Sequence, residues 1–239
     1  MTPYYERDGI TIFNADCREL LATMPAGSVD AVVTDPPYEI TATGGGIARS
    51  LQYLADIKGF TDTGFDYGLL SAFENWVCWG TLRQVPKLIE AAGSRRWMLV
   101  TWNKPNSAPL CYGNYLPDTE YAIHAWTGKA LYGECRSKSR FMVVPATQNK
   151  VHPNEKPVAI MEKCVTNASD KGQTILDPFA GSCTTGVAAW NLGRKAILCE
   201  IDEKYCELGA KRLDRVISQG RLFKPEPVRE TQATLEFDE

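Results

Sequence analysis

The stretch LDPFAGSCTTG at positions 176–186 decides how the rest of the sequence is interpreted. It has the pattern of a buried strand, a tight turn with glycine, and the start of a helix. In open α/β sheets, the crevice at the carboxyl end of such a strand is the usual position of a ligand. The stretch therefore predicts an α/β fold with a ligand site at this turn.

The sequence after the turn favours a ligand that contains a nucleoside. A helix is expected over 185–192 and a strand over 195–201, and the strand carries Glu200 near its end. A carboxylate about twenty residues after the glycines is the spacing at which ribose hydroxyls are bound. The turn has no lysine, and no Gly-Lys-Ser/Thr motif occurs, which disfavours phosphate binding. We expect an adenosine-containing, cationic cofactor without phosphate.

A second chemically informative stretch follows an earlier strand. The apolar residues 30–34 predict a strand buried on both faces, and it runs directly into Asp35, Pro36, Pro37 and Tyr38. The prolines fix the backbone and remove two N–H donors, which leaves the Pro36 carbonyl free to accept. This acceptor pair beside an aromatic ring suits a planar group with an exocyclic amine. The structural alternative is a strand-ending turn with a solvent-facing tyrosine.

The other elements fit the same fold class. Periodicity predicts strands at 10–13, 96–102, 120–126 and 174–176, and helices at 17–24, 69–92, 157–168 and 203–218. Residues 39–65 lose all periodicity, which is typical of a functional or mobile loop. We expect one domain over 1–223 and a flexible tail over 224–239.

Composition limits the functional class. The 239 residues carry a net charge of −3, which excludes an extremely basic nucleic-acid coat protein. A local basic excess lies between Lys129 and Lys156, and it is either a DNA-binding surface or an ordinary solvated loop. Eight scattered cysteines without metal-ligand spacing argue against zinc, and no metal is expected. Without a signal peptide or a membrane-spanning run, a reducing cytoplasm is the expected compartment.

Three motifs in order carry a family resemblance: Asp35 to Tyr38, HPNEKP at 152–157, and DPFAGS at 177–182. The chain resembles the amino-group (adenine-N6 or cytosine-N4) DNA methyltransferases of the permuted β class over about 10–213. The resemblance implies a doubly wound, Rossmann-like, seven-stranded mixed sheet with circularly permuted topology. It also implies an inserted DNA-recognition region, which we place at about 103–150.

The resemblance implies S-adenosylmethionine as the cofactor and the Asp35 to Tyr38 tetrapeptide as the catalytic motif. Asp16 and Cys17 would face the adenine ring, Glu200 the ribose, and Lys156 the methionine carboxylate. The full implied cofactor set is Asp16, Cys17, Asp35, Asn154, Lys156, Pro157, Asp177, Phe179, Ala180, Gly181, Ser182, Thr184, Glu200 and Ile201. Cys183 departs from the pattern, because many relatives have glycine there, and this position needs a roomier or altered turn.

The implied reaction is methylation of the N6 amine of a flipped-out adenine in a specific double-stranded DNA sequence. Arg136, Lys138 and Arg140 are candidate phosphate contacts. Aspartate at the first tetrapeptide position accompanies adenine in relatives, whereas serine is common in cytosine enzymes. A cytosine-N4 enzyme, a protein-glutamine methyltransferase and a catalytically silent DNA-binding subunit are the alternatives. Monomer and homodimer both remain open.

Two histidines need no catalytic role in this interpretation. The proposed chemistry does not require an imidazole, so His152 is interpreted as a polar loop residue beside a proline. His124 lies inside an expected strand, and we predict that it is a buried histidine with a hydrogen-bond partner.

Overall fold

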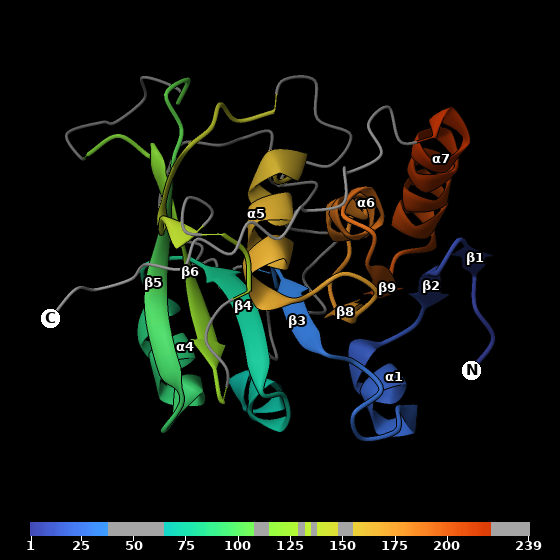
Figure 1. The fold of residues 1–239 in the computed structure, drawn as a ribbon, viewed down its shortest axis with the longest axis horizontal. Helices are drawn as coiled ribbons and strands as arrows, with labels where there is room; N and C mark the ends of the chain where they lie inside the picture. The colour runs from blue at the N-terminus through green and yellow to red at the C-terminus, as the bar shows by residue number, and fades with distance from the viewer. Residues whose placement is uncertain (38–64, 108–114, 129–131, 135–137, 148–154, 221–239) are drawn as a thin grey trace, which may run out of the picture.

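The computed structural model describes residues 1–37, 65–107, 115–128, 132–134, 138–147 and 155–220. Within these residues the chain forms a nine-stranded mixed sheet in the order β1-β2-β9-β8-β3-β4-β6-β5-β7 (Figure 1). The α/β prediction is therefore confirmed. The strands are β1 Tyr5–Arg7, β2 Ile10–Asn14, β3 Ala31–Thr34, β4 Asn75–Gly80, β5 Arg96–Asn103, β6 Thr119–Trp126, β7 Phe141–Val143, β8 Thr174–Asp177 and β9 Lys195–Glu200.

Five adjacent strands, β2, β9, β8, β3 and β4, run parallel, so their carboxyl ends meet at one edge of the sheet. Strand β6 is antiparallel to both of its neighbours, β4 and β5. The expected count of seven strands is too low by two. The two three-residue strands β1 and β7, at the ends of the sheet, are too short to carry a sequence pattern.

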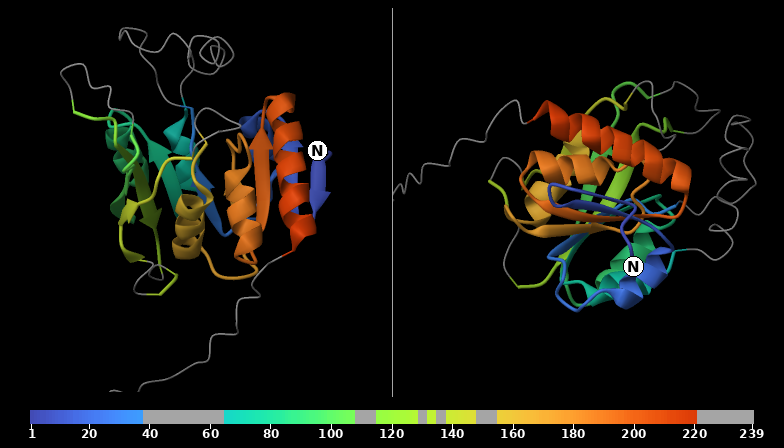
Figure 2. Two further views of the ribbon diagram at one scale, coloured as in Figure 1. Left: turned by 90° about the horizontal axis from the view of Figure 1, so that it is seen from above. Right: turned by 90° about the vertical axis from the view of Figure 1, so that its right-hand side faces the viewer.

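Helices cover both faces of the sheet (Figure 2). One face carries α5 Val158–Ala168, α6 Thr184–Asn191 and α7 Glu203–Gln219, which pack on a core that includes Ile160, Val187 and Leu213. The opposite face carries α1 Cys17–Thr23, the 3₁₀ helix η1 Tyr67–Ala72 and α4 Val85–Ala92. This doubly wound arrangement agrees with the expected fold class.

The single helix expected over 69–92 is wrong. The segment forms η1, then β4, then α4. Strand β4 lies between β3 and β6 and is covered on both faces, so every position from Trp76 to Gly80 is buried. A strand buried on both faces loses its polar alternation, and its apolar residues can match helical spacing by coincidence.

His124 is buried in β6, and its Nε2 lies 2.9 Å from Asn75 Oδ1. Burial lowers the pKa of His124 to about 4, which keeps the ring neutral at physiological pH. The prediction of a satisfied core histidine is confirmed. His152 lies outside the described residues.

None of the helices in the described part of the chain has the length and apolar character needed to cross a bilayer. In the same part of the chain, no three histidine, cysteine or acidic side chains group as metal ligands would. Residues 119–126 and 141–143, inside the expected recognition region of 103–150, belong to the sheet as β6 and β7.

Candidate active site

Acidic side chains gather at the edge where the parallel strands end. Asp16 follows β2, Glu200 ends β9, Asp177 ends β8, and Asp35 follows β3. These four strands are adjacent and parallel, so residues that are far apart in sequence meet there. Asp35 and the start of the 177–182 motif therefore lie on the same edge of the sheet, because β3 and β8 are parallel neighbours.

Asp177 holds the start of the glycine turn, defined here as residues 178–183. Its Oδ1 accepts from the Thr34 hydroxyl at 2.7 Å and from the Phe179 N–H at 3.1 Å, and its Oδ2 accepts from the Thr185 hydroxyl at 2.5 Å. Burial raises the pKa of Asp177 to about 6, although these donors work in the opposite direction. Asp177 thus ties β8 to β3 and to α6.

Glu200 supports the same turn from the next strand. Its Oε2 accepts from the Gly181 N–H at 2.8 Å, and its Oε1 accepts from the Asp202 N–H at 2.9 Å. Burial raises the pKa of Glu200, and the backbone donors counteract it. A carboxylate has about four acceptor positions, so both oxygens keep capacity for hydroxyl donors such as those of a ribose.

The turn uses left-handed backbone at Gly181 (φ 49°) and at Cys183 (φ 58°). A non-glycine residue in this conformation needs space for its side chain. Cys183 finds that space against α7, where a side chain at Gly209 would overlap Cys183 Sγ. The departure expected at position 183 is therefore accommodated by a glycine 26 positions later, with the left-handed turn intact.

Arg212 of α7 was not predicted, yet it joins two of the sequence motifs. Its Nη1 donates to the Ser182 carbonyl at 3.0 Å and to the Thr184 hydroxyl at 3.0 Å, and its Nη2 lies 2.9 Å from Glu155 Oε1. The arginine therefore links the glycine turn to the residues that precede α5. An arginine on a charged helix gives no local sequence signal for such a role.

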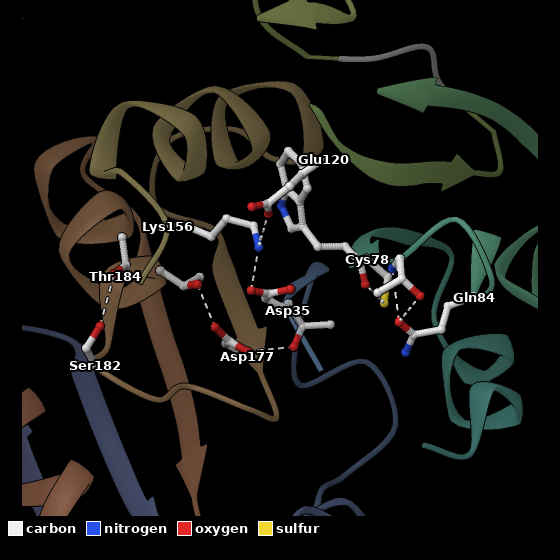
Figure 3. A network of polar contacts seen from close by, with 12 residues as sticks. Asp35, Cys78, Gln84, Glu120, Lys156, Asp177, Ser182 and Thr184 are labelled. Atoms are coloured by element: carbon white, nitrogen blue, oxygen red, sulfur yellow. Dashed lines mark hydrogen bonds and ion pairs between the residues drawn. The ribbon is translucent and has the colours of Figure 1, made fainter. Parts of the chain in front are cut away.

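Around Asp35, the charges are paired (Figure 3). Lys156 Nζ lies 2.6 Å from Asp35 Oδ2 and 2.9 Å from Glu120 Oε2, and Lys104 Nζ lies 3.1 Å from Glu120 Oε1. Burial works to raise the pKa of Glu120, but Lys156 and Lys104 outweigh it and hold this pKa below its ordinary value. Sequence reasoning missed Glu120 and Lys104.

The tetrapeptide is also held from the α4 side. Gln84 Nε2 donates to the Pro37 carbonyl at 3.4 Å. Gln84 is itself buried, and its Oε1 accepts from the N–H and the hydroxyl of Thr81, both at 2.9 Å. Pro36 is buried at the end of β3, and Tyr38 lies outside the described residues.

The remaining predicted residues lie in different places. Asp16 caps α1, accepts from the Arg18 N–H at 2.8 Å and forms an ion pair with the Arg18 guanidinium, which lowers the pKa of Asp16. Cys17 and Ala180 are buried, whereas Ile201 is half exposed. Phe179 packs edge to face on Phe65. Pro157 occupies the N-cap position of α5. Lys138 and Arg140 are exposed beside β7, and Asn154 and Arg136 lie outside the described residues.

Comparisons with known proteins agree on one family. The family model described as DNA methylase, N6_N4_Mtase, matches residues 29–211. The type II methyltransferase M2.LlaDCHI of Lactococcus lactis subsp. cremoris is 26% identical and covers 91% of this chain and 94% of its own. M2.DpnII of Streptococcus pneumoniae is 27% identical and covers 89% of this chain and 92% of its own.

A solved structure of similar fold is that of M1.HpyAVI, with a TM-score of 0.63 and 25% identity. The match covers 86% of this chain and 98% of that one. The family model spans well over half of the chain and includes the Asp35 tetrapeptide, Lys156, the glycine turn and Glu200. The chain therefore belongs to the N6/N4 family of DNA methylases.

Proposed function

We propose that this DNA methyltransferase transfers a methyl group from S-adenosylmethionine to the exocyclic N6 amine of an adenine in double-stranded DNA. The observation that carries the proposal is the bond between Thr34 and Asp177, 2.7 Å long. It joins β3, which is followed by Asp35, to β8, which is followed by the glycine turn. An amine acceptor and a cofactor site are thereby neighbours on one sheet edge.

The glycine turn and the acids beside it fit S-adenosylmethionine. When bound, this cofactor would supply the methyl group from its sulfonium centre. Glu200 offers half-buried acceptors for ribose hydroxyls, and Asp177 gives the turn its shape. Both acids are held by neutral donors, so their negative charge favours a cationic ligand. Asp16, Cys17, Phe179 and Ile201 are proposed to line the rest of the site.

Asp35 would act on the target amine. The lone pair of an aromatic exocyclic amine is delocalised into the ring, which makes the amine a poor nucleophile. Acceptors that engage its N–H groups, here the Asp35 carboxylate and the Pro36 carbonyl, favour a pyramidal nitrogen whose lone pair faces the methyl group. Transfer would form the nitrogen–carbon bond as the carbon–sulfur bond of the sulfonium breaks, and the contribution of this chain's residues would be chiefly positioning.

DNA is proposed to bind so that the target base leaves the duplex and stacks on Tyr38. The exposed cations Lys138 and Arg140 beside β7 are proposed phosphate contacts, together with Arg136. The enzyme would work in the cytoplasm, where the DNA lies. A monomer or a homodimer is compatible with this proposal.

The cytosine-N4 reaction is the second candidate, because its target is also an aromatic exocyclic amine that the same two acceptors could hold. A digest of DNA treated with enzyme and methyl-labelled S-adenosylmethionine decides between the two. The expected product is labelled N6-methyladenine. Labelled N4-methylcytosine alone would replace the proposed substrate, and unlabelled DNA together with cofactor binding would favour a silent DNA-binding subunit.

A further inference from the structure

Four charged side chains form a continuous series of contacts at the catalytic edge: Asp35, Lys156, Glu120 and Lys104. The three N–O distances along it are 2.6, 2.9 and 3.1 Å. The series joins the end of β3 to the residue before Pro157, then to the start of β6 and to the residue after β5. Two carboxylates and two ammonium groups balance in charge.

The ammonium of Lys156 occupies the centre of this arrangement. The Lys156 side chain is only 4% exposed, and its Nζ lies 5.1 Å from the centroid of the Trp79 ring. Trp79 is fully buried and packs edge to face on Trp102. A buried cation requires charged partners, and Asp35, just after β3, and Glu120, on β6, meet this requirement.

We propose that Lys156 and Glu120 are positioning residues for Asp35, and that Lys156 does not hold the carboxylate of the cofactor. The inference rests on the proposed function in one respect: Asp35 must be the acceptor for the target amine. Two of the three donors of Lys156 already meet carboxylates of this chain. The family resemblance alone had assigned Lys156 to the cofactor.

The physical role of Lys156 is electrostatic and geometric. A cation in contact with a carboxylate favours its ionised form, which is the form that accepts from an amine. The contact at Oδ2 also fixes the plane of the Asp35 carboxylate, while the group keeps acceptor capacity. Glu120, itself held by Lys104, anchors Lys156 in this place.

Other titratable groups also act on Asp35. The Cys78 thiol on β4 and the Asp177 carboxylate on β8 interact electrostatically with it. Burial raises the pKa of the Cys78 thiol well above its usual value, so Cys78 stays neutral. Lys156 is a cation in direct contact with Asp35, whereas Glu120 and Asp177 add negative charge nearby.

The first test is Lys156→Met, which keeps most of the side-chain volume. We expect kcat to fall at least about 100-fold, while calorimetry gives a Kd for S-adenosylmethionine within about threefold of wild type. The acid limb of the kcat pH profile should move to higher pH by about one unit or more, because two nearby carboxylates lose the cation between them.

The second test is Glu120→Gln, which keeps shape and removes one charge. In this variant the acid limb should move to lower pH, because Lys156 then interacts with Asp35 without a competing Glu120 carboxylate. We also expect kcat to fall about tenfold, because Lys156 loses an anion that holds it beside Asp35. Matched controls are Lys211→Met and Glu207→Gln, which break an exposed Lys–Glu pair on α7. Both controls should keep the wild-type profile.

Opposite shifts of the acid limb in the two variants would support the inference, since a general loss of structure would not produce them. Unmoved limbs, or shifts in one direction, would overturn it. A cofactor Kd weakened more than about tenfold in Lys156→Met, with kcat retained, would assign Lys156 to the cofactor instead. If Lys156→Met does not fold, the direction of the Glu120→Gln shift decides.

Failure of the proposed function would look different. Wild-type enzyme that binds S-adenosylmethionine but leaves DNA unmethylated would refute the methyl transfer. In that event, calorimetry on Lys156→Met still decides whether this lysine contacts the cofactor. A product of N4-methylcytosine would change the substrate and leave the roles of Lys156 and Glu120 intact.

Discussion

The acids that hold the glycine turn and the acids of the proposed catalytic half of the site have different kinds of partner. In the proposed cofactor half, formed by β2, β9 and β8, Asp177 and Glu200 accept from hydroxyls and backbone N–H groups, and Asp16 at its edge pairs with Arg18. In the proposed catalytic half, formed by β3, β4 and β6, Asp35 and Glu120 meet lysines. Burial accordingly raises the pKa of Asp177 and Glu200, whereas lysines lower that of Glu120.

This difference suggests a division of labour by charge. Neutral donors hold a carboxylate in place without cancelling its charge, so the cofactor half remains suited to a cation. Lysines balance the charge of the acids that we propose to surround the target amine, so a neutral base would enter a site whose negative charges are compensated.

The largest effect is expected in the catalytic half, from Asp35→Ala. Loss of the amine acceptor should reduce kcat by at least about 10²–10³-fold. Binding of S-adenosylmethionine should stay within about tenfold, a difference below roughly 1.4 kcal/mol. Single-turnover kinetics and calorimetry measure the two quantities, and Asp214→Ala, at an exposed acid, is the control. Full activity of Asp35→Ala would refute the catalytic assignment.

The second prediction concerns Asp177 and pH. Its folded-state pKa of about 6 exceeds the ordinary value of 3.8, so the folded state favours the protonated form. The wild-type protein should therefore lose stability relative to Asp177→Asn as pH rises from about 4 to 6, by about 2–3 kcal/mol, with no further change above. Denaturant unfolding at pH 4, 5, 6 and 7 measures this difference. Parallel curves for the two proteins would contradict it.

The third prediction tests the cofactor half directly through Glu200→Ala. Loss of a charged hydrogen-bond acceptor should weaken binding of S-adenosylmethionine by ~1.5–3 kcal/mol. At saturating cofactor, kcat should change far less than in Asp35→Ala. Calorimetry gives the affinity, with the neighbouring Glu203→Ala as control. An unchanged Kd would remove Glu200 from the cofactor site.

The smallest effect is expected outside both halves, at Arg140. If its guanidinium contacts a DNA phosphate, Arg140→Ala should reduce the slope of log K against log salt by about one unit, with the cofactor affinity unchanged. Arg215→Ala, at an exposed arginine on α7, is the matched control. An unaltered slope would leave the basic excess near β7 as an ordinary solvated surface.

The sequence was most informative where local chemistry determines structure. The glycine turn, the strand before Asp35 and the strand ending at Glu200 were predicted close to their observed bounds, because apolar runs and turn residues mark them. Strand β4 was misread because burial on both faces removes its alternation. The charge pairing of Lys156 was also missed, because it joins residues 121 positions apart that only the sheet order brings together.

The packing of Cys183 against Gly209 has a consequence for anyone who engineers this turn. If residues 181–186 alone were randomised, every variant would have to pack into the unchanged space at Gly209 of α7. Selection would then favour small or thiol side chains at 183. Grafting a double-glycine turn would leave that space empty, at a cost that grows with the void. The two positions are best varied together as one design unit, with a larger residue at 209 offered only when 183 becomes glycine.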